Sequence, residues 1–150
     1  MLYTGCMLAF CYTFLFDTGH PENRLDSRAD VCMDVVEEAA RQGVDPMLAV
    51  SVAHVESGFR RGARSHAGAV GPMQVIPRFW CKSKPCNHIE AGVRALRTYT
   101  ESHGEGEGLC RYVSGRSCRG SKIRRRYRDK VLRFKRSADN LFHLLCTDGC

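Results

Sequence analysis

The segment that most constrains the fold is a short stretch that is apolar on nearly every side of a helix. Asp45 and Pro46 form a typical helix start, with a capping side chain followed by proline at the first helical position. The residues from Met47 to Val55 are apolar except for Ser51 and His54. A helix of this kind has no face to present to water, so other elements must cover it. We therefore expect it at the centre of a helical core.

A second helix is expected over Arg28–Gln42, just before the apolar one. Its apolar residues recur at helical spacing. Ser27 and Asp30 form a capping-box pattern at its start, and Gly43 is a typical stop. No run of residues has the alternation of a strand, so the sequence predicts a mainly α protein.

The second half of the chain predicts further helical segments. Asn87 is a suitable cap for a helix from His88 to about Ser102. The stretch His103–Gly108 alternates glycine and glutamate and is expected to be a mobile loop. The other expected helices are a short one at 77–80, a turn at 109–113 and a basic amphipathic helix at 123–142.

Length and composition favour one globular domain. The chain has 150 residues, of which 43% are hydrophobic and 26% charged. This balance excludes a disordered, collagen-like or multi-span membrane protein. The expected division is an apolar segment at 1–16, a linker at 17–26, a main domain at 27–145 and a cysteine-containing tail at 146–150.

The apolar segment at residues 1–16 leaves two interpretations open. It carries no charge, but it is shorter than the roughly 20 residues that span a bilayer. It resembles the apolar part of an export signal, although no basic residue precedes it and no clear cleavage site follows. It is either a degenerate signal or anchor, or an unprocessed N-terminal helix.

The chain contains nine cysteines, an odd number that leaves at least one without a partner in the same chain. No C-x-x-C pair occurs, which argues against structural zinc and thioredoxin-like chemistry. The short separations of Cys81 from Cys86 and of Cys110 from Cys118 predict two local disulfides. These would place the protein in an oxidising compartment. The alternative is a cytosolic chain with nine reduced thiols.

Glu56 is the candidate catalytic residue. It follows the apolar helix and lies in its last turn, where burial and the helix dipole both raise a carboxyl pKa. A carboxyl that stays protonated near neutral pH can act as a general acid. The alternative is a glutamate at a frayed helix end, facing water. His54 lies near the opposite face of the helix, and neither Cys32 nor Cys86 has a histidine placed by motif to activate it.

A second carboxylate is absent from the sequence that follows Glu56. No Asp or Glu occurs over residues 57–89. Glycosidases that use two carboxylates need a base or nucleophile opposite the acid. If Glu56 is the acid, its partner must come from Glu90, from the Glu101–Glu107 stretch or from the substrate itself.

Several motifs then occur in a defined order. They are Gly43–Val50, Glu56–Phe59, Ser65–Pro77, Asn87–Leu96, Tyr112–Gly115, and Tyr127 followed by Val131. Together they resemble the soluble lytic transglycosylases, which share a lysozyme-like α fold with goose-type lysozyme. One departure is Val113, which stands where this family has asparagine.

The resemblance implies a lysozyme-like single domain with a buried catalytic helix and a basic C-terminal helix. It also implies cleavage of the β-1,4 bond between N-acetylmuramic acid and N-acetylglucosamine, with a 1,6-anhydromuramic product. Glu56 is then the sole catalytic acid and base, and no metal or organic cofactor is implied. The implied substrate-binding residues are Ser65, Met73, Gln74, Tyr112 and Tyr127, although core packing is the alternative for Met73 and Tyr127.

Partners and location follow from the same resemblance and from charge. The net charge is +7, and residues 111–136 hold twelve basic residues and one acidic residue. We expect peptidoglycan glycan strands and anionic cell-wall polymer as partners. The expected location is the bacterial cell envelope, periplasmic or exported, or reached through a phage particle or secretion apparatus. The oligomeric state is not predicted.

Two other functions compete with the transglycosylase. One is a hydrolytic goose-type lysozyme, in which a second carboxylate activates water. The other is a non-catalytic protein that binds cell wall or nucleic acid. Nucleic acid is not expected, because the sequence has no zinc-ligand spacing, recognition-helix pattern or aromatic platform.

Overall fold

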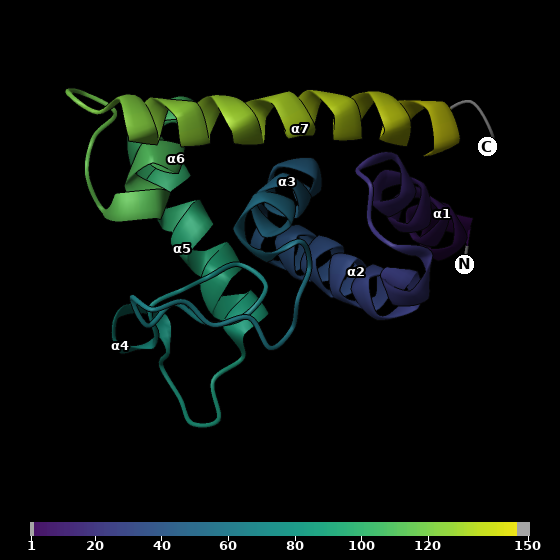
Figure 1. Cartoon of the computed structure of the whole chain (residues 1–150), viewed down its shortest axis with the longest axis horizontal. Helices are drawn as coiled ribbons and strands as arrows, with labels where there is room; N and C mark the ends of the chain where they lie inside the picture. The colour runs from purple at the N-terminus through teal and green to yellow at the C-terminus, as the bar shows by residue number, and fades with distance from the viewer. Residues whose placement is uncertain (1, 147–150) are drawn as a thin grey trace.

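The computed structural model describes residues 2–146 and is built from helices (Figure 1). Over these residues it contains no strand, only two isolated β-bridges that join Val70 to Arg64 and to Val75. The predicted mainly α class is confirmed. The elements are α1 Leu2–Asp17, the 3-10 turn η1 Glu22–Arg24, α2 Leu25–Gln42, α3 Pro46–Ser57, α4 Pro77–Trp80, α5 His88–His103, α6 Glu105–Ser114 and α7 Lys122–Cys146.

Helix α3 is the central helix, as the sequence predicts. The Asp45 side chain accepts hydrogen bonds from the backbone N–H groups of Met47 and Leu48, at 2.9 and 3.4 Å. Gly58 ends the helix with a φ of 59°, a left-handed conformation that glycine adopts without strain. Helices α2 and α7 pack against α3, and Figure 1 shows α7 running across the top of the bundle.

The apolar N-terminal segment forms α1 and belongs to the core. Phe10 and Leu15 are fully buried, and the rings of Phe10 and Phe14 stack with their centroids 5.7 Å apart. Helix α1 packs against both α2 and α7. None of the helices between residues 2 and 146 is long and apolar enough to cross a membrane.

Helix α2 begins earlier than the sequence predicts. It starts at Leu25 rather than Arg28, and the capping position is Arg24, which makes no side-chain cap. The expected capping box at Ser27 is therefore wrong, and the Ser27 hydroxyl instead donates to the carbonyl of Arg24 at 3.2 Å. Leu25 packs against the hydrophobic core, which extends the helix by one turn.

The stretch expected to be a mobile loop is the start of α6, so that prediction is wrong. Gly104 separates α5 from α6, and the second helix begins at Glu105. A Cβ atom on Gly108 would lie 2.8 Å from the Cα of Thr100 in α5. Glycine is needed here because the two helix backbones approach closely, and it does not signal a loose chain.

Between residues 2 and 146, four disulfides connect the elements. The two predicted local bonds, Cys81–Cys86 and Cys110–Cys118, are both present. Two more join distant segments: Cys11–Cys32 links α1 to α2, and Cys6–Cys146 links α1 to the end of α7. The ninth cysteine, Cys150, and most of the expected tail lie outside the described residues.

Candidate active site

A cavity of about 280 Å³ opens beside the C-terminal end of α3. It is bounded by α3, the 65–76 loop, α4, α5 and α6. Glu56 is the one acidic residue in its lining, among the residues that the structure describes. The lining residues are Glu56, Ser65, Ala67, Ala69, Gln74, Val75, Ile76, Trp80, Ala95, Tyr112 and Val113.

Glu56 is held in an environment that favours its protonated form. Burial raises the pKa of its carboxyl group to about 7. The hydroxyl of Tyr127 donates a hydrogen bond to Oε1 of Glu56 at 2.6 Å, which opposes that rise by stabilising the carboxylate. The carboxyl group is therefore able to give up and take back a proton near neutral pH.

Tyr112 and Met73 form a pair beside Glu56. The hydroxyl of Tyr112 donates to the backbone carbonyl of Met73 at 2.6 Å and so joins α6 to the loop before α4. Burial, and then the nearby charge of Glu56, raise the pKa of Tyr112 well above its ordinary value. The Met73 side chain is fully buried against Gly92 and does not line the cavity.

The loop over residues 65–75 places two polar side chains at the cavity. Ser65 is exposed, and its hydroxyl accepts the backbone N–H of Ala69 at 3.1 Å. Gln74 has a φ of 52°, in the left-handed region, and its side chain donates to the carbonyl of Gly71 at 2.9 Å. Both side chains line the cavity, so the structure brings Ser65, Gln74, Tyr112 and Tyr127 around Glu56.

Trp80 also lines the cavity, although the sequence did not predict it as a site residue. It ends the short helix α4, and its ring meets the ring of Tyr99 edge to face at 5.6 Å. Helical spacing gives no signal in a helix of four residues. The available signal is the presence of an aromatic side chain one residue before the Cys81–Cys86 disulfide, which restrains the chain next to the cavity.

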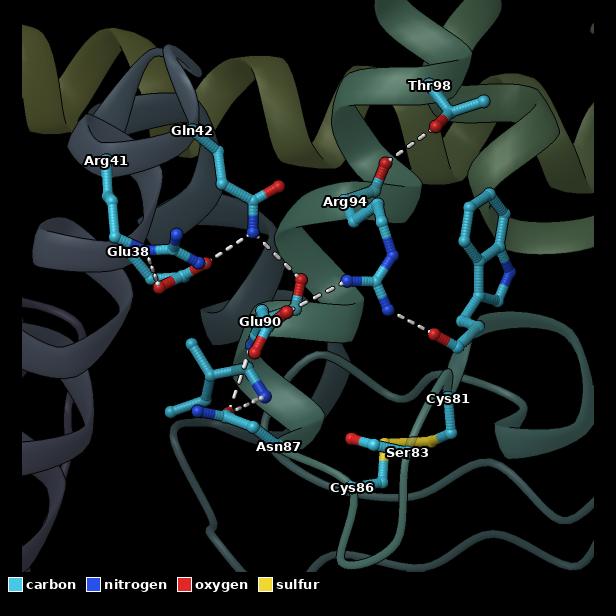
Figure 2. Close-up of polar contacts among 12 residues, drawn as sticks. Glu38, Arg41, Gln42, Cys81, Ser83, Cys86, Asn87, Glu90, Arg94 and Thr98 are labelled. Carbon is cyan, nitrogen blue, oxygen red and sulfur yellow. Dashed lines mark hydrogen bonds and ion pairs between the residues drawn. A yellow bond between two sulfur atoms is a disulfide. The ribbon is translucent and has the colours of Figure 1, made fainter.

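A polar network joins α2 to α5 beside the Cys81–Cys86 disulfide (Figure 2). Arg94 donates to the backbone carbonyl of Trp80 and forms an ion pair with Glu90 at 3.1 Å. The amide of Gln42 donates to the carbonyl of Glu90 at 3.0 Å and to the carboxylate of Glu38. The wall of the cavity is thereby anchored to α2.

The other acidic candidates lie outside the lining of the cavity. Glu90 pairs with Arg94, and Glu101 pairs with Arg97 at 2.8 Å. Glu107 accepts the backbone N–H of Cys118 at 3.3 Å, and Glu105 lines a separate concavity formed with α7. None of the four is in the lining of the cavity that holds Glu56.

The remaining candidates have structural roles. His54 lies on the opposite side of α3, where its Nδ1 is 3.2 Å from Nε2 of His20 and its ring packs on Phe134. Cys32 and Cys86 are both in disulfides. The donor atoms of Cys81, Cys86 and His88 lie within 4.8 Å of one another, but the disulfide occupies both sulfur atoms.

Comparison with known proteins agrees with this geometry. Residues 34–133 match the family model described as the transglycosylase SLT domain. The chain belongs to the SLT transglycosylase family. The match begins in α2 and ends in α7, and it includes Glu56 and every residue that lines the cavity.

The curated relatives of this SLT chain are longer proteins. It resembles the membrane-bound lytic murein transglycosylase C of Haemophilus influenzae, with 34% identity over 92 residues that cover 49% of this chain and 26% of that protein. The counterparts of Klebsiella pneumoniae and Sodalis glossinidius are each 44% identical over 55 residues, covering 36% of this chain and 15% of theirs. The chain thus spans about a quarter or less of these relatives. No solved structure matches the chain.

Proposed function

We propose that the protein is a peptidoglycan lytic transglycosylase. It cleaves the β-1,4 bond between N-acetylmuramic acid and N-acetylglucosamine and leaves a 1,6-anhydromuramic end. The observation that carries the proposal is a single acidic side chain, Glu56, in the lining of its cavity, with a pKa of about 7. Membership of the SLT family and the names of the lytic transglycosylase relatives support it.

Glu56 acts first as the acid and then as the base. Its proton passes to the glycosidic oxygen as the bond to C1 of the muramic acid breaks. The N-acetyl carbonyl of the sugar stabilises the positive charge that develops at C1. The carboxylate of Glu56, stabilised by the hydroxyl of Tyr127, then takes the proton of the C6 hydroxyl group, and that oxygen closes onto C1. Water is not the nucleophile, so no second carboxylate is required.

The side chains around Glu56 position the glycan strand. Ser65 and Gln74 supply hydroxyl and amide groups from the loop, and Tyr112 and Val113 line the cavity from α6. Trp80 offers an aromatic ring next to these polar groups. Met73 contributes through its backbone carbonyl, which fixes Tyr112, while its buried side chain fills the core.

The site of action is the bacterial cell envelope. The relatives are named as membrane-bound murein enzymes, and the four disulfides suit an oxidising compartment outside the cytoplasm. The protein is periplasmic or exported, or arrives through a phage particle or secretion apparatus. The basic face of α7 then holds the enzyme on anionic cell-wall polymer through its exposed residues Lys122, Arg125, Arg126, Lys130, Arg133 and Arg136.

The test is mass spectrometry of purified peptidoglycan after digestion. We expect new muramic ends that lack the mass of one water, together with a loss of activity of at least ~100-fold in Glu56→Gln. Ends that carry the additional water would identify a hydrolytic lysozyme instead. A Glu56→Gln variant that digests at the wild-type rate would remove Glu56 from the mechanism.

A further inference from the structure

A second concavity, larger than the Glu56 cavity, lies on another part of the surface. Its volume is about 650 Å³, and it shares no lining residue with the Glu56 cavity. It lies where the loop before α2 and the first turns of α2 meet the chain that follows α3. The lining residues are Pro21, Arg24, Ser27, Arg28, Asp30, Phe59, Arg60 and Arg61.

The lining has a strong excess of positive charge. It contains four arginines and one acidic residue, Asp30. Arg61 has a counter-ion, because its guanidinium lies 2.5 Å from the carboxylate of Asp34. The side chain of Arg24 forms no hydrogen bond or ion pair with any residue between 2 and 146. Burial and the neighbouring charges of Arg60 and Arg24 lower the pKa of Arg28.

Arg28 and Arg60 are fixed by the end of α3 while donors remain free. Nη1 of Arg28 contacts the carbonyl of Gly58 at 2.8 Å and Nδ1 of His20 at 2.7 Å. Nε of Arg60 donates to the carbonyl of Ser57 at 2.9 Å. The other guanidinium nitrogens of both residues have no protein partner among the described residues, and Arg60 is exposed while Arg28 is half-buried. They are held in place and can donate to a ligand.

We propose that this concavity, which we call the arginine pocket (Arg24, Arg28, Arg60 and Arg61), is a binding site for phosphate groups. Planar guanidinium groups donate paired hydrogen bonds to phosphate oxygens, and they keep their charge at every physiological pH. With Asp30 in the lining and Asp34 paired to Arg61, the four arginines leave an excess of two positive charges, which matches a multiply charged phosphate better than a single carboxylate. The ligand is a free phosphate compound or a phosphodiester polymer, and both present the same chemistry.

Calorimetric titration with inorganic pyrophosphate at constant ionic strength tests the proposal. Wild type should bind pyrophosphate saturably at one site. It should not bind acetate. The informative variant is Arg24→Gln with Arg61→Gln, because both side chains are exposed and neither caps α3. We expect its affinity for pyrophosphate to fall at least ~10-fold. Its thermal melt should show that the fold is kept, since an exposed ion pair contributes little.

The matched control is Arg116→Gln with Arg119→Gln, which removes the same charge from exposed positions on the loop before α7. It should bind pyrophosphate within about twofold of wild type, because distant exposed charges are largely screened. Equal weakening in the two double variants would overturn the proposal, and so would acetate binding as tight as pyrophosphate or the absence of saturable binding.

Two further measurements complete the test. A poly(glycerol phosphate) chain that competes with pyrophosphate for wild type, and not for the pocket variant, would make a phosphodiester polymer the ligand. A polymer that does not compete would make it a free phosphate compound. Glu56→Gln should bind pyrophosphate as wild type does, so this site stands independently of the proposed glycan cleavage.

Discussion

Tyr127 and Glu56 are 71 residues apart in the chain, yet the phenol of one donates to the carboxyl group of the other at 2.6 Å. The bond joins α7 to the end of α3. Burial raises the pKa of Glu56 to about 7, and the bond from Tyr127 opposes this. The pair therefore sets the pH range over which the carboxyl group can act as an acid.

Replacing Tyr127 with phenylalanine should move the pH dependence of activity upward. Glycosidic cleavage needs protonated Glu56, so activity falls as the pH rises through its pKa. Without the phenol the pKa of Glu56 rises further, and the alkaline limb should shift by about one pH unit. The measurement is kcat/KM against pH.

The control for this shift is Tyr112→Phe. In wild type the Tyr112 hydroxyl donates to the carbonyl of Met73 and not to Glu56. The alkaline limb of the pH profile of Tyr112→Phe should therefore coincide with that of wild type. If the alkaline limb of the pH profile does not move in Tyr127→Phe, the phenol does not affect the pKa of Glu56.

The Glu56→Gln variant should be more stable than wild type at alkaline pH. The folded pKa is about 7, raised from an ordinary value of 4.5. The stabilising effect of the protonated form is fully present below pH 4.5 and is lost as the pH rises through 7. Relative to wild type, Gln should gain about 2–3 kcal/mol in unfolding free energy between pH 4 and pH 8. Urea unfolding across this range measures the gain, and a difference that does not change with pH would contradict it.

Acid should destabilise the fold through His54. Arg28 can only donate, so His20 must accept at Nδ1, and its other nitrogen then donates to His54. Burial, then the charges of His20 and Lys130, lower the pKa of His54 from 6.5 to about 4. Stability contributed by the neutral ring is present above pH 6.5 and is lost as the pH falls through 4.

The variant that isolates this effect is His54→Phe, which keeps a ring beside Phe134. Wild type should lose about 1–2 kcal/mol relative to this variant between pH 7 and pH 4, since partial exposure of the ring to solvent reduces the effect. If the difference in unfolding free energy between wild type and His54→Phe stays constant between pH 7 and pH 4, His54 is not the cause of the acid destabilisation.

The basic face of α7 should hold the protein on sacculi in a salt-sensitive way. Arg126 and Lys130 are exposed, whereas Arg124 caps the preceding loop through the carbonyl of Ser117 at 2.6 Å. Changing Arg126 and Lys130 to glutamine should weaken binding to sacculi roughly two- to tenfold at physiological salt. Co-sedimentation with sacculi measures this loss.

A control with the same charge change is Arg41→Gln with Arg97→Gln, on exposed parts of α2 and α5. Its binding should stay near that of wild type. Binding that is unaffected by salt would argue against an electrostatic tether on α7.

The Cys11–Cys32 disulfide should stabilise the packing of α1 on α2. The bond closes a loop with a sequence separation of 21 residues. Replacing both cysteines with alanine should cost about 3 kcal/mol of unfolding free energy, mainly because the unfolded chain gains freedom. Non-reducing peptide mapping should recover all four disulfides, and free thiols at residues 11 and 32 would refute this pairing.

Residues close together in the sequence determined the central helix α3 and its candidate catalytic residue, Glu56. Asp45 and Gly58 set the ends of α3, and the apolar residues between them require burial. Glu56 follows from these facts, because a carboxyl group at the end of a buried helix has little access to water. Asn87 and the two short disulfides were predictable for the same reason: their partners lie within a few residues.

The tertiary structure alone decided which distant groups meet. In the folded protein Tyr127 donates a hydrogen bond to Glu56, and the Met73 side chain is buried in the core. Trp80 lines the cavity, and two separate segments form the arginine pocket. The tertiary structure also made Gly108 a point of close helix contact, where composition indicated a loop. Periodicity and capping report on interactions between near neighbours in sequence. Contacts between residues far apart in the chain depend on how the helices pack, and no local pattern records that.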